Sequence, residues 1–469
     1  MSNIKKGIIW TSGEKLLTQL VQFILGIIIA RLITPQEYGV LGIVMVFIYV
    51  AEVFVDSGLG SALIYRNNLD KKDIQTTFSF NFIVSFTLSV LMFVGSPFIE
   101  DFFKLESLAS LMRIASLVLI FNSFVIVPTC ILKIKQNFKA LSISNFVSTL
   151  VSGVIGVFFA YSGYGVWALI IQLLSRSFLL MILITVQCQW LPNFSFCLKS
   201  FKGLWKYSAN LLTLHSLTKL VEEGVSFIIG KTLTPYCLGL YTRGLQFASL
   251  PNAIIGSVLS TVMFPTLSSY KHDELLFYKI YRKTIIIQSI LIPPIYIGLA
   301  IISEPLVSLL LGEKWMDVVP VLQIFCFGKS IFSLANTTEH ALCSLGYSNI
   351  ALKQQIYKML VKLILILFAI RWGFMAVAIA NAVADFSAYF ITNYCSRKII
   401  TYSIIKQFKD ISIIIFAALL AGACGYLLSG FVSFPVLKIM VVIIVSVFIY
   451  VGMLFIMKKL EINTIKIIV

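Results

Sequence analysis

Apolar stretches of about 20 residues recur along the whole sequence, separated by short segments that contain Pro, Gly and charged residues. An α-helix needs about this length to cross roughly 30 Å of hydrocarbon, and in a bilayer only helices and closed barrels satisfy every backbone polar group. The 469-residue chain is 59% hydrophobic and 12% charged, with a mean hydropathy of +0.96, which is too apolar for a soluble protein. The sequence therefore predicts an all-α, polytopic membrane protein.

The apolar runs predict about fourteen transmembrane helices, with ends placed to within a few residues. The first run continues from the basic start of the chain without a small-residue cleavage motif, so the first helix is expected to be retained. The predicted spans are 10–33, 38–63, 77–99, 108–131, 141–161, 164–187, 205–230, 237–267, 284–304, 318–345, 350–371, 374–395, 411–430 and 435–457.

Charge alternates between successive connections, and this alternation predicts the orientation in the membrane. Every second connection is basic, and the connections between them are acidic or nearly uncharged, as at Glu37, Glu100 to Glu106 and Glu304 to Asp317. By the positive-inside rule, both termini are expected to be cytoplasmic. The basic segments are Lys5 and Lys6, Arg66 to Lys72, Lys133 to Lys139, Lys199 to Lys206, Lys271 to Lys283, Arg397 to Lys409, and Lys458 to Lys466.

One short motif occurs twice. The stretch Ile28 to Leu41 contains Thr34-Pro35 followed by Gly39, and Ile228 to Tyr241 contains Thr234-Pro235 followed by Gly239 in the same register. Pro suits the first turn of a helix, where its missing N–H costs nothing, and Gly lets two backbones approach closely. We interpret the two copies as helical hairpins at one membrane face, in two halves related as parallel repeats.

The repeat predicts how the chain divides. We expect an N-terminal six-helix lobe at 1–188, a C-terminal six-helix lobe at 205–396, and two additional helices with a cytoplasmic tail at 397–469. Between the lobes, residues 189–204 carry aromatic residues interleaved with lysines. This composition fits a segment lying on the cytoplasmic membrane surface, and an ordinary linker is the alternative.

Ionisable residues at mid-helix depth cost roughly 2.5–3.5 kcal/mol each on insertion scales, so they are expected to face a cavity or one another. We predict that seven of them contact an anionic substrate: Lys219, Lys329, Lys358, Lys362, Arg176, Arg243 and His215. Five acidic residues are candidates for ion or proton coupling: Glu52, Asp56, Glu222, Glu223 and Asp385. In both groups the alternative is an internal ion pair, for which Lys219 and Glu223 are well spaced.

Other classes of function lack a sequence signal. The net charge of +17 is spread over connections between helices, so no nucleic-acid patch is expected. The eight cysteines are scattered, which predicts neither a metal site nor a disulfide framework. There is no glycine-rich phosphate loop and no nucleophile elbow, so we expect neither a cofactor nor an enzyme.

Several short motifs occur together in one order along the chain: Ala30 to Gly39, Asp56 to Ile64, Ile228 to Gly230, Leu238 to Arg243, Pro251 and Phe264 to Ser268. Through these motifs the sequence resembles the polysaccharide biosynthesis, O-antigen (Wzx-type) flippases of the multidrug/oligosaccharidyl-lipid/polysaccharide exporter superfamily. The resemblance implies two MATE-like six-helix lobes, alternating access, and a location in the bacterial cytoplasmic (inner) membrane. Two extra terminal helices also occur in related peptidoglycan-precursor flippases, where they help form a groove for the lipid tail.

These observations predict a flippase that moves a polyprenyl-diphosphate-linked oligosaccharide, a repeat unit of O-antigen, capsule or exopolysaccharide, from the cytoplasmic to the outer leaflet. Its expected partners are that lipid, membrane lipid, H⁺ or Na⁺ as coupling ion, and a polysaccharide polymerase or export complex. The alternatives are a multidrug/cation antiporter on the same scaffold and a non-transporting membrane scaffold for glycan synthesis.

Overall fold

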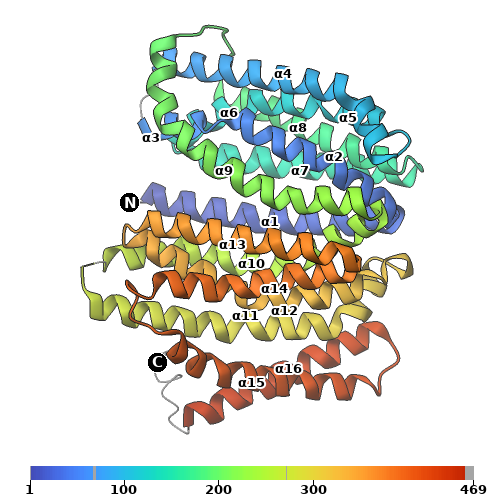
Figure 1. Cartoon of the computed structure of the whole chain (residues 1–469), viewed down its shortest axis with the longest axis vertical. Helices are drawn as coiled ribbons and strands as arrows, with labels where there is room; N and C mark the ends of the chain where they lie inside the picture. Colours follow the sequence, from blue (N-terminus) through green and yellow to red (C-terminus); the bar gives the residue numbers. More distant parts are fainter. Residues whose placement is uncertain (1, 67–69, 271, 460–469) are drawn as a thin grey trace. The chain divides into compact units, whose positions relative to one another are not determined.

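The computed structural model describes residues 2–66, 70–270 and 272–459, and every regular element in these ranges is helical (Figure 1). Helices of 22 to 37 residues predominate, long enough to cross a membrane. The helices are α1 (Ser2–Leu32), α2 (Pro35–Asp56), α3 (Leu59–Arg66), α4 (Lys71–Phe103), α5 (Leu108–Ala115), α6 (Leu117–Ile134), α7 (Phe138–Tyr161), α8 (Val166–Cys188), α9 (Leu198–Thr232), α10 (Pro235–Ser269), α11 (Glu274–Leu310), α12 (Val318–Ser344), α13 (Ser348–Ala369), α14 (Phe374–Ser396), α15 (Ile404–Ser429) and α16 (Pro435–Lys459), with short 3₁₀ turns at Glu313–Trp315 and Ile370–Trp372.

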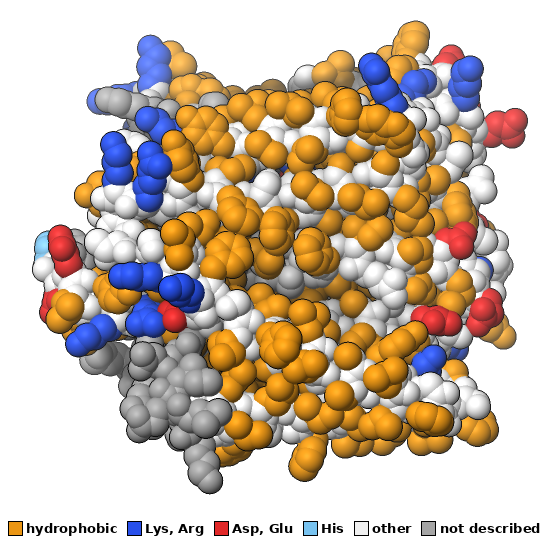
Figure 2. All heavy atoms as spheres, turned by 60° about the horizontal axis from the view of Figure 1, so that its bottom comes forward, with side chains coloured by type: hydrophobic (Ala, Val, Ile, Leu, Met, Phe, Trp, Pro, Cys, Tyr) orange, Lys and Arg blue, Asp and Glu red, His pale blue; other side chains and the backbone are white. Residues whose placement is uncertain are grey.

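The predicted all-helical membrane fold is confirmed. Each expected span overlaps a helix, and two spans are made of two helices each, α2 with α3 and α5 with α6. Within the described residues, 10 helical segments are long and apolar enough to cross a membrane, and Leu17–Leu32 is a shorter apolar helix. The count of fourteen stays a prediction. Figure 2 shows hydrophobic side chains over most of the surface in view, with charged side chains of both signs at its edges.

The chain forms two compact units, Met1–Gly239 and Leu240–Val469. In the first unit, α7 packs against α1 and α8, α6 packs against α4 and α8, and α9 packs against α2, α3 and α4. In the second, α12 packs between α11 and α14, α13 packs against α14, and α15 and α16 pack against α11. Helix α9, which the repeat assigns to the C-terminal lobe, thus lies within the first unit, and the lobe boundaries at 188 and 205 stay a prediction.

The duplicated motif forms a helix–turn–helix in both copies. In the first, the Thr34 hydroxyl accepts a hydrogen bond from the Glu37 backbone N–H, and the Glu37 carboxylate accepts from the Thr34 backbone N–H, so α2 begins with a capping box. In the second, the Thr234 hydroxyl accepts from the backbone N–H of Cys237 at 3.3 Å. Pro35 and Pro235 are the first residues of their helices, as expected from their sequence positions.

The two glycines of the motif let the copies contact each other. A Cβ added to Gly39 would lie 1.6 Å from the Pro235 carbonyl oxygen, and a Cβ added to Gly239 would lie 1.9 Å from the Pro35 carbonyl oxygen. Each turn therefore packs its glycine against the backbone of the other turn, so the two contacts are equivalent, as in a two-fold symmetric pair. The expected close backbone approach is confirmed, and it occurs between the two repeats.

The segment between α8 and α9 packs its rings onto α4. Trp190 and Phe194 contact Phe78, with ring centroids 5.4 and 5.3 Å apart, and Phe201 contacts Phe80 at 4.9 Å. Two hydrogen bonds, from the Ser79 hydroxyl to the Ser195 carbonyl and from the Cys197 N–H to the Thr76 hydroxyl, fix its backbone on the same helix. Residues 189–204 are thus attached along α4, and their contact with the membrane surface stays a prediction.

Candidate functional site

A cavity of about 360 Å³ opens in the first unit where a membrane helix is interrupted. Helix α2 ends at Asp56, Ser57 takes a left-handed conformation with φ 48°, and α3 starts at Leu59. The buried Ser57 hydroxyl donates to the amide oxygen of Asn81 on α4 at 3.0 Å, which stabilises the break. Interrupted helices at membrane depth are tolerated where they line a polar cavity, so the break and the cavity are consistent with each other.

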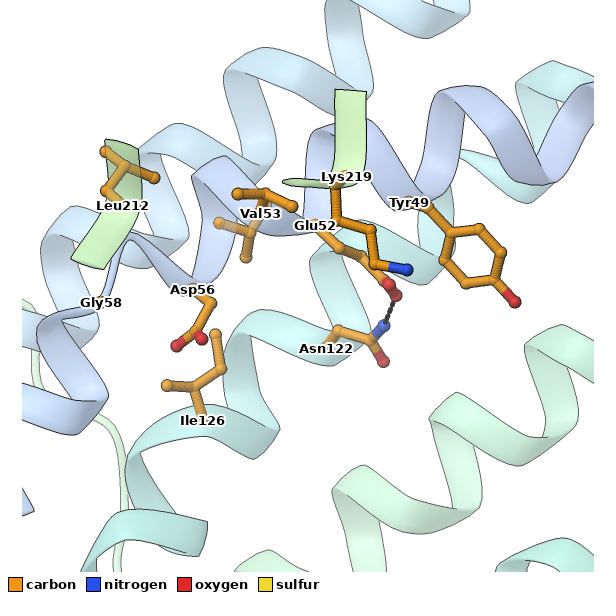
Figure 3. Close-up of a pocket in the computed structure, with 10 residues that line it drawn as sticks. Tyr49, Glu52, Val53, Asp56, Gly58, Asn122, Ile126, Leu212 and Lys219 are labelled. Carbon is orange, nitrogen blue, oxygen red and sulfur yellow. Dashed lines mark hydrogen bonds between the residues drawn. The ribbon is translucent and has the colours of Figure 1, made fainter. Parts of the chain in front are cut away.

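Polar side chains from three helices meet in this cavity (Figure 3). Glu52 and Tyr49 come from α2, Asn122 from α6 and Lys219 from α9, and Asp56 lies at the end of α2. The Asn122 amide donates to the Glu52 carboxylate at 2.6 Å. Figure 3 shows the side chains of Lys219, Glu52 and Asn122 directed toward one another. One turn of α2 separates Glu52 from Asp56, so the helical period places both carboxylates on the cavity wall.

Lys219 is held by carboxylates on its own helix and remains accessible. Its ammonium nitrogen lies 3.2 Å from Glu222 and 3.7 Å from Glu223, and 5.2 Å from the centre of the Tyr49 ring. The predicted ion pair with Glu223 is thus confirmed. The Lys219 side chain is still 41% exposed, and an exposed ammonium at mid-helix depth requires a water-filled space.

Arg176 on α8 extends the charged region. Its side chain is exposed and lies within electrostatic range of Tyr49 and Glu52. The structure therefore brings together five residues that the sequence singled out, and they come from the three helices α2, α8 and α9: Glu52, Asp56, Arg176, Lys219 and Glu223. The side chain of His215 lies outside the described residues.

The cations of the second unit are mostly paired. The Lys329 ammonium on α12 lies 2.8 Å from the Asp385 carboxylate on α14, with side chains 14% and 7% exposed. The Lys358 ammonium on α13 lies 2.6 Å from the Glu339 carboxylate on α12, and the Lys358 side chain is 8% exposed. In this conformation Lys329 neutralises the buried Asp385 and Lys358 neutralises the half-buried Glu339, which is the internal ion-pair alternative.

The remaining predicted cations are also held within the second unit. Arg243 is buried on α10, donates to the side-chain oxygen of Gln246 at 2.6 Å, and lies 5.9 Å from the centre of the Trp315 ring. Lys362 is half-buried on α13. Predicted contact of these residues, of Lys329 and of Lys358 with substrate stays a prediction.

Three participants were missed by the sequence interpretation. Asn122 has a neutral side chain in a mostly apolar helix, so its polar amide was the only feature that could have indicated a functional role. Glu339 is the only acidic residue within α12, and that isolation was a usable signal. Tyr49 precedes Glu52 by one turn on α2, but tyrosines are too common in membrane helices to be diagnostic. Within the described residues, no group of three or more His, Cys, Asp or Glu residues could hold a metal ion.

Known proteins resemble this chain in sequence. The profile of the polysaccharide biosynthesis protein family matches residues 28–320. The succinoglycan biosynthesis transport protein ExoT of Rhizobium meliloti (strain 1021) is 23% identical over 334 residues, which cover 71% of this chain and 68% of ExoT. The lipopolysaccharide biosynthesis protein WzxC of Escherichia coli (strain K12) is 23% identical over 387 residues, which cover 76% of this chain and 75% of WzxC.

Solved structures share the fold. The lipid II flippase MurJ, in an inward closed conformation, superposes with a TM-score of 0.82 at 17% identity and covers 97% of this chain and 100% of its own. An inward-facing MATE family multidrug transporter superposes with a TM-score of 0.64 at 15% identity, and the match covers 82% of this chain and 94% of the transporter. Since the family profile spans more than half of the sequence, this chain belongs to the polysaccharide biosynthesis protein family.

Proposed function

We propose that this chain moves a polyprenyl-diphosphate-linked oligosaccharide from the cytoplasmic to the outer leaflet of the bacterial inner membrane by alternating access. The observation that carries the proposal is the mid-membrane cavity of the first unit, into which Lys219 presents an accessible ammonium group. The name of WzxC, a lipopolysaccharide biosynthesis protein, and the flippase fold of MurJ support the same class of substrate.

The cavity chemistry suits a diphosphate. Lys219 and Arg176 are exposed, whereas Lys329 and Lys358 are buried in ion pairs, so the first pair is available to an anion without breaking an existing buried contact. Arg binds phosphate through parallel N–H groups and Lys binds it as a point charge. The polyprenyl tail would stay in the lipid while these cations stabilise the headgroup at membrane depth.

Glu52 is the residue that we assign to ion coupling. It accepts a hydrogen bond from Asn122 and is exposed to the same cavity, whereas Glu223 and Asp385 are each within 4 Å of a lysine ammonium. When the Glu52 carboxylate binds a proton or Na⁺, the cavity loses one negative charge near Lys219, and the repulsion of an anionic headgroup by Glu52 disappears. In proteoliposomes, Glu52→Gln should transport without responding to an imposed H⁺ or Na⁺ gradient.

The charge pattern of the connections supports cytoplasmic termini, since basic connections alternate along the chain with acidic or nearly uncharged ones. A polysaccharide polymerase or export complex that consumes the lipid-linked product would be the natural partner on the outer side.

The test uses cells that lack this gene. We expect polyprenyl-diphosphate-linked oligosaccharide to accumulate on the cytoplasmic leaflet and surface polysaccharide to be lost, with both effects reversed by the restored gene. Lys219→Glu should fail to restore export at normal protein levels, whereas Lys219→Arg, which keeps the charge, should restore it. Full export with Lys219→Glu would refute a cationic path through this cavity.

A cation antiporter is the second candidate, because the same cavity also holds Glu52, Asp56 and the Tyr49 ring, which could bind a cationic drug. Unchanged surface polysaccharide together with altered resistance to cationic dyes in the deleted strain would favour it. A scaffold without transport activity predicts instead that neutralising Lys219 and Glu52 has no effect on export.

A further inference from the structure

The second unit carries an apolar groove of about 530 Å³ between α13 and α14. Its α13 wall is formed by four residues at positions i, i+3, i+4 and i+7, which places them on one stripe of the helix. Most of them are exposed, so the other helices of the unit do not cover the groove. The lining residues are Tyr357, Leu360, Val361 and Ile364 on α13, and Phe390, Ile391, Tyr394 and Cys395 on α14.

Exposed cations mark one end of this groove. Lys353 lies one turn before Tyr357 on the same stripe of α13, and the Arg397 guanidinium lies 4.1 Å from the ring centre of Tyr394. Lys398 is exposed beside Arg397. The sequence contains no Asp or Glu in 340–372 or in 386–409, so these charges have no acidic neighbour along either helix. An apolar channel ending at two cations is complementary to a lipid with an anionic headgroup.

The exposed apolar stripe of α13 is as long as one membrane leaflet is deep. Beyond Ile364 the exposed apolar surface of α13 continues through Leu367 and Phe368, and the Phe368 ring contacts Trp372 with centroids 4.4 Å apart. From Lys353 to Phe368 the helix rises about 22 Å, at about 1.5 Å per residue. One leaflet with its headgroups is about 20–22 Å deep. A lipid whose headgroup lies at Lys353 can therefore keep its chain on apolar surface along the whole stripe.

We propose that the α13–α14 groove binds the isoprenoid tail of the lipid carrier, with its diphosphate at Lys353 and Arg397, before the headgroup is moved across the membrane. The inference rests on the proposed function, because it takes its substrate class from there. It assigns the tail to a different pair of helices from the C-terminal pair, α15 and α16, for which the family resemblance implies such a role.

Cys395 in the groove wall provides a direct test. The purified full-length protein in zwitterionic nanodiscs is treated with a lipid-soluble maleimide, and alkylation of each cysteine is measured by peptide mass spectrometry. Cys424 on α15 is the internal control, because it is half-buried like Cys395 and lies outside the groove. Long-chain polyprenyl diphosphate should slow alkylation of Cys395 several-fold and leave Cys424 unchanged.

Two further lipids make the result decisive. Farnesyl diphosphate carries the same headgroup on a short tail, and phosphatidylglycerol carries an anionic headgroup on ordinary acyl chains. Both should protect Cys395 much less than the long-chain diphosphate. Equal protection by phosphatidylglycerol would assign the groove to bulk anionic lipid, and no protection by any of the three would leave it without a lipid ligand. Either result overturns the proposal.

Filling the groove tests its role in transport. Leu360→Trp and Ile364→Trp should slow flipping of a long-tailed substrate several-fold but not that of a short-tailed analogue, whereas the exposed control Leu91→Trp on α4 should affect neither. Normal flipping by both groove variants would reject the tail site and keep the flippase. Protection of Cys395 in a protein that flips neither substrate would reject the flippase and keep the lipid site.

Discussion

Replacing Gly39 by Ala tests the contact between the two repeated turns. The added Cβ would lie 1.6 Å from the Pro235 carbonyl oxygen, whereas real Cβ atoms essentially never come within 3.0 Å of such an atom. One turn must therefore move by more than about 1 Å, and overpacking of this kind costs about 1–3 kcal/mol. At about 2–4 °C per kcal/mol for a unit of this size, the apparent Tm in detergent should fall by about 2–12 °C.

Gly95 on α4 is the matched control, because a Cβ there meets nothing within 4 Å. Gly95→Ala removes backbone freedom from the unfolded chain and should raise the stability by about 0.5–1 kcal/mol. The two substitutions are chemically identical, so a difference in sign can only come from the surroundings of each glycine.

The reciprocal variant Gly239→Ala makes the prediction stricter. Its Cβ would lie 1.9 Å from the Pro35 carbonyl oxygen, so one outward movement of the turns would relieve both contacts. The double variant Gly39→Ala/Gly239→Ala should then lose less stability than the two single losses added together, as expected for neighbouring sites. The reasoning is refuted if Gly39→Ala melts at or above the temperature of the unchanged protein.

Three further predictions concern buried ion pairs and one exposed thiol. Asp410→Ala removes the carboxylate that accepts from the Arg282 guanidinium at 2.7 and 3.0 Å and should destabilise the second unit by about 3–5 kcal/mol, seen as a lower Tm, with Asp410→Glu milder. Lys329→Met should lower the free energy of unfolding by about 3–5 kcal/mol, because Asp385 is left buried and unpaired. The double variant Lys329→Met/Asp385→Leu should recover the Tm. Export by that stable double variant would show that Lys329 does not bind substrate. Cys197 has a pKa below the usual thiol value because the Ser200 backbone and hydroxyl, then the Lys199 backbone, donate to the thiolate. The thiolate fraction of Cys197 at neutral pH therefore exceeds that of an ordinary cysteine, and it declines as the pH falls through the lowered pKa. A charged, impermeant maleimide should label Cys197 rapidly in inside-out vesicles. Rapid labelling in intact cells instead would contradict a cytoplasmic position.

Local features of the sequence predicted a helix in each expected span and the turn between the first two helices. The Thr-Pro turn is set by residues that are neighbours in the chain, since the Thr34 hydroxyl caps α2 and Pro35 begins it. The break between α2 and α3 lies inside the expected span 38–63 and was not predicted, although Ser57 and Gly58 are a short polar residue and a glycine that allow positive φ. These features follow from dihedral preferences and hydrogen bonds within one turn, so they can be recognised without knowing the tertiary packing.

The role of the charged residues stays a prediction, and only the ion pairs within one helix could be deduced from the sequence. Lys219 and Glu223 pair along one helix, and that contact follows from the spacing. Lys329 meets Asp385 on another helix, 56 positions later, because α12 and α14 pack closely where a Cβ on Gly328 would touch the Ala382 backbone. A pattern along one helix fixes which face is polar, and it leaves open which neighbour that face meets.

Burial then separates residues that look alike in the sequence. Lys219 and Lys358 are both lysines in the middle of long helices, yet the first is 41% exposed beside a cavity and the second is 8% exposed against Glu339. Removing the Lys358 charge would leave a carboxylate without its partner, so a loss of activity there would report on folding as much as on substrate. Removing the Lys219 charge leaves Glu222, whose side chain is 53% exposed, to be solvated by water, whereas Glu223 at 13% is solvated less. A functional defect at Lys219 without a stability defect is therefore the stronger evidence for a substrate contact, and Lys219 is the cation at which the proposed function should be judged.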